Sequence, residues 1–174
     1  MKRFLIIGNY NAVIWKDVFP HITDNSIWLG VNKRGMDFIT PDGLSNINAV
    51  WFTNLDNEKR HTPLKLTKTY NPIDYPKYDN YDVINVNKTN DIPKDYDGVM
   101  GVPLTYFDKY NPDEFKIIGV ACGNSWKNYP DTLKQLGFNP NMKYGGGLGS
   151  AILNGQALYT RLFIKKTDEQ RQST

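Results

Sequence analysis

Several kinds of residue and motif are scarce in this chain, and each absence excludes a class of protein. One cysteine, Cys122, in 174 residues excludes an internal disulfide and a cysteine-rich zinc site. The two histidines, His21 and His61, lie too far apart in sequence to predict a metal site. No apolar run approaches the ~20 residues of a membrane span, and the start of the chain does not resemble a signal peptide. We therefore expect a cytoplasmic protein without a membrane partner.

Motifs of self-sufficient catalysis are also missing. The sequence has no G-x-x-x-x-G-K-[ST] phosphate-binding loop, and Gly145–Gly149 does not fit G-x-G-x-x-G because position 150 is serine. No pair of acidic residues has a spacing that specifies acid–base roles. We therefore assign no catalytic, cofactor-binding or metal-binding residue to this chain.

The composition is that of a folded domain. Hydrophobic residues make up 40%, aromatic residues 13% and charged residues 22% of the chain. The mean hydropathy is −0.55 and the net charge is +3. This balance disfavours disorder and permits a polyanionic partner.

Residues 1–56 have the pattern of an α/β sheet. Phe4–Ile7 and Ile27–Val31 are apolar runs of the kind found in strands covered on both faces, and Ala49–Thr53 is a third strand candidate. Asn11–Phe19 has helical spacing and is followed by Pro20, which predicts a strand–helix–strand crossover. Because one crossover cannot cover such strands, we expect the last part of a larger α/β domain.

Residues 57–166 have a different character. Prolines and tyrosines predict an ordered, loop-rich region without long helices. Asn154-Gly155 favours a type I′ turn, and we expect a β-hairpin whose second arm exposes Arg161, Lys165 and Lys166. Residues 167–174 are expected to fray. Other predicted elements are strands at Val83–Val86 and Phe115–Val120 and a short helix at Asp131–Leu136.

Seven segments in a fixed order resemble one family. They are Phe4–Asn9 (FLIIGN), Ile27–Asn32 (IWLGVN), Trp51–Asp56 (WFTNLD), Tyr75–Asn87 (YPKYDNYDVINVN), Asp91–Pro103 (DIPKDYDGVMGVP), Asp108–Phe115 (DKYNPDEF), and Asn154-Gly155 with the strand after it. This order resembles the EcoRI-type adenine-specific DNA methyltransferases of restriction–modification systems. The resemblance covers about Phe4 to Lys166.

The resemblance implies transfer of a methyl group from S-adenosylmethionine to the N6 amino group of adenine in double-stranded DNA. Such enzymes flip the target base out of the duplex, where aromatic side chains stack on it. Family members also carry a glycine-rich cofactor loop and an Asn/Asp-Pro-Pro-aromatic tetrapeptide, and this sequence has neither. Asn71–Asp74 and Asn111–Glu114 each lack the second proline and the aromatic residue. We therefore expect the C-terminal half of such an enzyme, α/β in class. It would comprise the last strands of a Rossmann-like methyltransferase sheet and a loop-rich α+β DNA-recognition region with a C-terminal β-hairpin.

Two groups of residues are candidates for contact with DNA. The phosphate candidates occur in two basic stretches, and a solvated loop is the alternative for both. Those candidates are Lys33, Arg34, Lys59, Arg60, Lys65 and Lys68. Trp51 or Phe52 is a candidate wall for the flipped adenine, with core packing as the alternative. Asn9 is a candidate for the same cleft or, alternatively, a helix cap.

Three functional hypotheses follow. The chain is part of a split or longer methyltransferase whose N-terminal catalytic half can be a separate chain, a stand-alone DNA-binding module, or a non-functional remnant. We expect it alone to bind no S-adenosylmethionine and to transfer no methyl group. We also expect apolar surface at Phe4–Ile7 and Ile27–Val31, which a homodimer would cover.

Overall fold

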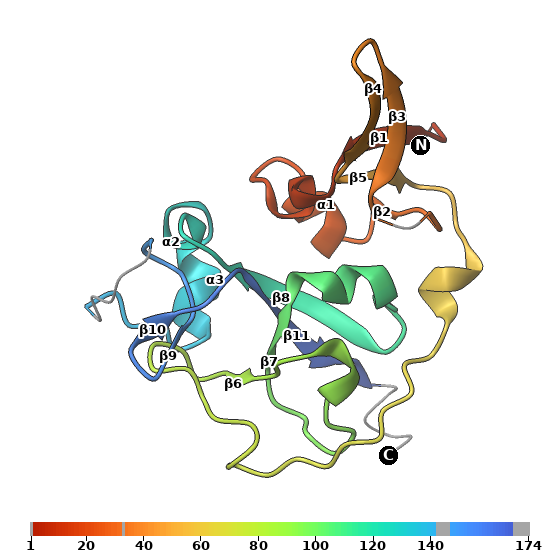
Figure 1. Ribbon diagram of the computed structural model, residues 1–174. Coiled ribbons are helices and arrows are strands. Elements are labelled where there is room, and N and C mark those ends of the chain that lie inside the picture. The colour runs from red at the N-terminus through yellow and green to blue at the C-terminus, as the bar shows by residue number, and fades with distance from the viewer. Residues whose placement is uncertain (1, 33, 142–146, 169–174) are drawn as a thin grey trace. The chain divides into compact units, whose positions relative to one another are not determined.

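The computed structural model describes residues 2–32, 34–141 and 147–168 and is a mixed α/β structure of small sheets and short helices (Figure 1). The chain divides into two compact units, each described by itself. The first unit comprises Met1–Thr62 and Phe107–Tyr110, and the second comprises Pro63–Tyr106 and Asn111–Thr174. No helix in the described ranges is long and apolar enough to cross a membrane.

The first unit contains a three-stranded sheet and a two-stranded ribbon. Its elements are β1 (Leu5–Asn9), η1 (Tyr10–Ile14), α1 (Phe19–Thr23), β2 (Trp28–Leu29), β3 (Met36–Thr40), β4 (Gly43–Ile47), β5 (Ala49–Thr53) and η2 (Glu58–His61). The sheet has the order β1-β5-β2, and β5 is antiparallel to both neighbours. The strands β1 and β2 therefore run parallel, as the predicted crossover requires, but with β5 inserted between them.

The helical segment between β1 and β2 differs from the prediction. The expected helix at 11–19 is replaced by η1, and α1 begins at Phe19. Pro20 lies in the first turn of α1 and does not end a helix, because an N-terminal helical position needs no hydrogen bond from its nitrogen. Val13, Phe19 and Ile22 are buried beneath this segment.

The strand β1 is not covered on both faces. Leu5, Ile6 and Ile7 are 52%, 57% and 44% exposed, whereas Val50 and Phe52 of β5 are buried. Val31 is exposed as well, although Leu29 is buried. The expected apolar surface is therefore confirmed on β1 and at Val31.

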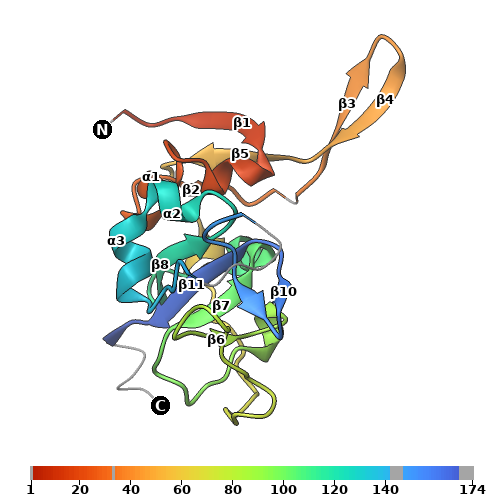
Figure 2. The ribbon, with the colours of Figure 1, turned by 90° about the vertical axis from the view of Figure 1, so that its left-hand side faces the viewer.

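The ribbon formed by β3 and β4 has no counterpart in the sequence prediction. Five residue pairs join the two strands, and Gly43 turns the chain between them with a φ of 116°. Figure 2 shows the ribbon standing out from the β1-β5-β2 sheet. The strand β4 is exposed at every residue and therefore lacks the alternation that marks a half-buried strand, whereas β3 alternates between half-buried and exposed residues.

The second unit contains a four-stranded sheet with the order β6-β7-β11-β8. Its elements are β6 (Ile84–Asn85), η3 (Thr89–Asp91), β7 (Met100–Pro103), η4 (Leu104–Lys109, which continues into the first unit), β8 (Phe115–Ala121), α2 (Ser125–Asn128), α3 (Pro130–Gln135), β9 (Ile152–Leu153), β10 (Gln156–Ala157) and β11 (Arg161–Lys166). Strands near residues 84 and 118 and a helix ending before Gly137 are confirmed.

The predicted C-terminal hairpin is correct at its turn and wrong in its second arm. Asn154 and Gly155 have φ values of 51° and 75°, as the type I′ turn requires, and they join β9 to β10. The chain then leaves the hairpin, and β11 enters the larger sheet between β7 and β8. Lys166 is consequently buried, where its Nζ donates a hydrogen bond to the Lys94 carbonyl.

The loop-rich region is ordered by its tyrosines. Tyr75, Tyr78, Tyr81 and Tyr106 are buried, which confirms the expectation from composition. The Tyr81 ring packs edge-on against Phe163 with 4.9 Å between centroids. These rings add to the core that strand and helix residues such as Val120, Leu133 and Phe163 form.

The expected fraying does not begin at residue 167. The Thr167 amide donates to the Glu114 carbonyl at 2.9 Å, and its hydroxyl donates to the Asp113 carbonyl at 2.7 Å. Residues 169–174 and 142–146, the latter including part of the predicted Gly145–Gly149 loop, lie outside the described residues.

Candidate nucleic-acid interface

Arg60 is buried in the first unit. Its Nη1 donates to Asp56 Oδ1 at 3.1 Å, and its Nη2 donates to Asn25 Oδ1. The guanidinium carbon lies 3.5 Å from the centroid of the Trp28 ring, which is cation–π geometry. The guanidinium of Arg60 is therefore bound by Asp56, Asn25 and Trp28 of the same unit. In this conformation it does not face a phosphate outside the protein.

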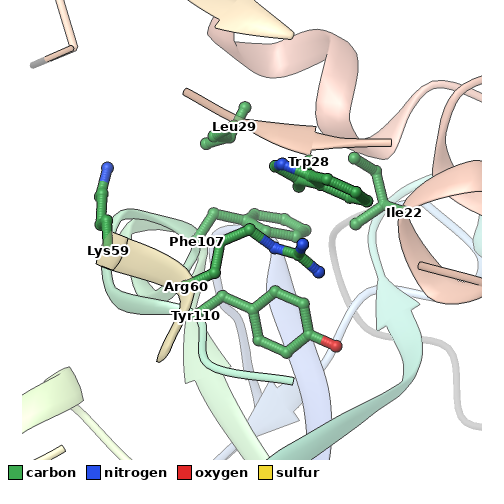
Figure 3. Close-up of a pocket in the computed structure, with 7 residues that line it drawn as sticks. All are labelled: Ile22, Trp28, Leu29, Lys59, Arg60, Phe107 and Tyr110. Carbon is green, nitrogen blue, oxygen red and sulfur yellow. The ribbon is translucent and has the colours of Figure 1, made fainter. Parts of the chain in front are cut away.

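The empty space beside Arg60 is a small internal cavity and is too small to be a binding pocket. Figure 3 shows Arg60 reaching among Trp28, Phe107 and Tyr110, with Ile22 beside the indole. The cavity there has a volume of about 20 Å³, which is room for about one water molecule. A base or a cofactor does not fit.

The residues beside Arg60 form a small polar cluster. His61 Nε2 lies 2.9 Å from Asp56 Oδ1, and this hydrogen bond holds the pKa of the Asp56 carboxyl below its usual range. Lys59 is half-buried, and its Nζ donates to the Gly30 carbonyl at 3.4 Å. The Lys59 hydrogen bond connects η2 to the residue that follows β2.

Arg34 lies beside a buried tyrosine. Its guanidinium carbon is 4.7 Å from the centroid of the Tyr10 ring, while the arginine itself remains exposed. Burial and the Asp108 carboxylate raise the pKa of the Tyr10 hydroxyl, against the opposing effect of Arg34. The ring contact orients an exposed cation near the end of β1. Its neighbour Lys33 lies outside the described residues.

Lys65 and Lys68 belong to the second unit and are both exposed. The Lys68 carbonyl accepts a hydrogen bond from the Lys94 amide at 2.9 Å, which pairs its segment with the chain near Pro93. Lys68 also lines a polar cavity of about 280 Å³ with Asp74, Tyr75, Asn87 and Asp91. The sequence-adjacent candidates thus divide between the two units.

The three base-pocket candidates have different environments. Asn9 caps η1, since its Oδ1 accepts from the Asn11 amide at 2.8 Å. Phe52 is buried, and a Cβ at Gly8 would lie 2.9 Å from its ring, so a larger residue at position 8 would displace the ring. Trp51 is half-buried and points to the other face of the sheet, as alternation along β5 predicts.

Trp51 lines the larger apolar cavity of the first unit. This cavity has a volume of about 300 Å³, within the range of ligand sites. Its lining residues are Leu5, Gly30, Val31, Asn32, Trp51, Thr53, Leu55, Asp56 and Asn57.

An unpaired amide lies in the wall of this cavity. Both polar atoms of the Asn57 side chain are buried and have no hydrogen-bond partner, although such a group ordinarily finds one. The Asn32 amide differs, because its Oδ1 accepts from the Trp51 backbone at 3.1 Å. Trp51 gives the cavity an aromatic face, and a turn of the Asn57 side chain would bring a donor and an acceptor to a planar ligand there. No sequence signal had singled out Asn57.

The residues directly after β1 form the short helix η1. The strand runs directly into η1 through the Asn9 cap, without a glycine-rich loop. Among the described residues there is also no cluster of three or more metal-ligating side chains. The described part of the first unit therefore offers an apolar cavity of about 300 Å³ as its candidate ligand site.

Comparison with known proteins identifies relatives along nearly the whole chain. The sequence profile described as "Adenine-specific methyltransferase EcoRI" matches residues 1–49 and 42–167. Type II methyltransferase M.EcoRI of Escherichia coli is 49% identical over an alignment of 143 positions, which covers 70% of this chain and 44% of that protein. Type II methyltransferase M.MgeORF184P of Mycoplasma genitalium is 34% identical over an alignment of 188 positions, gaps included, which covers 95% of this chain and 57% of that protein.

Type II methyltransferase M.MpnI of Mycoplasma pneumoniae is 33% identical over an alignment of 187 positions, gaps included, which also covers 95% of this chain and 57% of that protein. The chain thus spans about half the length of the curated relatives it matches. No solved structure matches it significantly. On the profile match and these identities, the chain belongs to the EcoRI family of adenine-specific methyltransferases.

Proposed function

We propose that this chain is the C-terminal portion of an S-adenosylmethionine-dependent DNA adenine-N6 methyltransferase of a type II restriction–modification system, acting in the cytoplasm. It contributes DNA recognition and the last strands of the catalytic sheet, and it is inactive alone. The observation that carries the proposal is a family match over nearly the whole chain that spans only about half of each relative.

The free edge of β1 supports a sheet that continues into the rest of the enzyme. Only β5 pairs with β1, so one edge of this strand has no neighbour among the described strands. Its apolar side chains are exposed on both faces, as expected of a strand made for the interior of a parallel sheet. We infer that further strands of a Rossmann-like sheet pair with β1 and that a helix covers Ile6, on the face opposite the cavity lined by Leu5 and Trp51.

The cavity at Trp51 and Asn57 is the proposed wall of the adenine site. An amide side chain can make two hydrogen bonds to the edge of adenine, and an aromatic side chain can stack on a flipped base. Asn57 has both an unpaired donor and an unpaired acceptor there. We do not retain Phe52 and Asn9, because the first is core and the second is a cap.

The chain's own residues position DNA and perform no chemical step. S-adenosylmethionine supplies the methyl group when the complete enzyme binds it. Phosphate contacts from Arg34, Lys59, Lys65 and Lys68 would hold the duplex, with Arg60 excluded by its burial. The division at residue 57 between sheet and recognition region is part of this proposal.

The test is reconstitution. The probe is a polypeptide comprising the part of the Escherichia coli relative that this chain does not match. We expect no transfer of labelled methyl groups to adenine by the chain alone, and transfer after the two polypeptides are mixed or co-expressed. Methylation by the pure chain would show that it is active alone, while no methylation and no duplex binding by the mixture would refute the proposal.

A stand-alone DNA-binding module is the second candidate. Sequence-selective, salt-sensitive duplex binding by the chain, unchanged by the added polypeptide, would favour it. A homodimer formed over the free edge of β1 would be a third outcome and would support neither the N-terminal partner nor the monomeric module. The molar mass of the chain in solution shows whether such a dimer forms.

A further inference from the structure

The β3–β4 ribbon leaves the first unit at a particular edge of its sheet. It connects the end of β2 with the start of β5, and Ala49 at that start pairs with Asn9 at the end of β1. Two backbone hydrogen bonds hold its base there, from Tyr10 to the Asn48 carbonyl at 2.9 Å and from Gly35 to the Ala49 carbonyl at 3.3 Å. The ribbon therefore stands at the carboxyl ends of the parallel strands β1 and β2, where α/β sheets place their ligands.

The tip of the ribbon is apolar and exposed. Ile39 and Leu44 lie directly opposite each other and are 93% and 73% exposed. Opposite residues share a face, so the two side chains form one apolar point near the turn. A two-stranded hairpin is only marginally stable in water, and exposed apolar side chains at its tip indicate a surface that binds something.

The charges of the ribbon are unlike those of a phosphate-binding element. Residues 35–49 contain no lysine, arginine or histidine and two aspartates. The Asp37 carboxylate accepts from Asn46 Nδ2 across the ribbon at 2.7 Å, which leaves Asp42 at the turn. The exposed cation nearest in sequence is Arg34, at the base and against Tyr10.

We propose that the β3–β4 ribbon is a base-reading element, which enters the major groove of the duplex and contacts base edges with Ile39 and Leu44. This inference rests on the proposed function and adds to it the part of the chain that selects sequence. The major groove admits a two-stranded ribbon, and apolar side chains there contact the thymine methyl group. Arg34 at the base would meet the phosphates that border the groove.

DNA is favoured over a protein partner by the position of the ribbon. It rises from the same edge of the sheet as Arg34 and the end of β1, and not from the free edge of β1 where the rest of the sheet is expected. The lack of basic residues agrees with a division of labour, in which phosphate contacts position a protein and base contacts specify a sequence.

The experiment selects binding sites from a random-sequence duplex pool, with the chain alone and with the reconstituted mixture. The variant carries Ile39→Ser and Leu44→Ser, and the matched control carries Ile73→Ser, at a residue of the second unit that is 90% exposed. We expect the ribbon variant to lose about tenfold or more in its preference for the selected site over random duplex. Its salt dependence should stay unchanged, because no phosphate contact is removed.

A second measurement does not depend on stability of the ribbon. A photo-crosslinking amino acid at position 39 should crosslink to bases of the selected duplex, and the same amino acid at position 73 should not. The inference is overturned if the ribbon variant selects the same site with the same preference, or if duplex is bound without any selected site. It is also overturned if the variant changes only the association state, which would identify a protein-docking surface. No duplex binding by either preparation would refute the proposed function itself.

Discussion

The guanidinium of Arg60 and the indole of Trp28 are stacked with 3.5 Å between the guanidinium carbon and the ring centroid. This pair joins η2 to β2, two segments about thirty residues apart. Asn25 and Asp56 accept hydrogen bonds from the same guanidinium. One of the six cations predicted to contact DNA is therefore part of the packing of the first unit.

Arg60→Ala is expected to destabilise the protein by about 2 kcal/mol, because it removes a buried side chain with its ring contact and its hydrogen bonds to Asp56 and Asn25. Urea denaturation followed by circular dichroism measures the change. Lys59→Ala is the matched control at the neighbouring, half-buried cation, with an expected change of at most about 1 kcal/mol. Equal losses from the two substitutions would contradict a structural role specific to Arg60.

Ile6→Asp is expected to weaken binding of the complementary polypeptide by about tenfold or more, since it places a charge on a strand that must be buried. Calorimetric titration of the two polypeptides measures this. Ile73→Asp changes an equally apolar, exposed residue outside β1 and should leave the affinity unchanged. An unchanged affinity for Ile6→Asp would show that the sheet does not continue at β1.

Asn57→Ala is expected to leave stability unchanged or raised by about 1 kcal/mol, because it removes a buried amide that has no partner. Methylation by the reconstituted enzyme should nevertheless fall by about tenfold if this amide contacts adenine. Asn32→Ala is the contrasting variant and should lower stability by about 1 kcal/mol through loss of its bond to Trp51. Full methylation by Asn57→Ala would remove this residue from the base site.

Stability should decline in alkali. Burial raises the pKa of Tyr10, Tyr78 and Tyr81 above the ordinary value of 10.0, so the folded protein holds these protons more tightly than the unfolded chain. Their contribution is complete below pH 10 and is lost as the pH rises from 10 toward the folded-state pKa values. Urea midpoints measured across this range, with tyrosinate absorbance, test it. Tyrosines that all ionise near pH 10 in the folded protein would contradict their burial.

Asp42→Asn is expected to raise affinity for duplex DNA by about fivefold at low salt, equivalent to about 1 kcal/mol for one repulsive charge near phosphates. Fluorescence anisotropy at ~50 mM and ~200 mM salt measures the affinity. Asp131→Asn removes an exposed carboxylate from α3 of the second unit and serves as the control. An affinity change no larger than that of the control would place the turn of the ribbon away from the duplex.

Local sequence patterns were sufficient for several elements. The apolar runs at β1 and β5, the strand β8 and the turn at Asn154-Gly155 were all predictable, because strand runs and residues that tolerate positive φ are signals within a few residues. The order of short motifs along the chain was likewise enough to indicate the family. The element signals and the motif order can both be read directly from the order of residues along the chain.

Tertiary structure decided what those elements pair with and which side chains remain available. Whether β11 extends a hairpin or enters a sheet depends on β7 and β8, which lie far away in sequence. Arg60 and Lys65 belong to one basic stretch, yet Trp28 and Asn25 bury the first while the second stays exposed. The unpaired amide of Asn57 and the projecting ribbon exist only as relations in space. Burial and hydrogen bonding depend on neighbours that the chain brings together by folding, and no periodicity in the sequence records them.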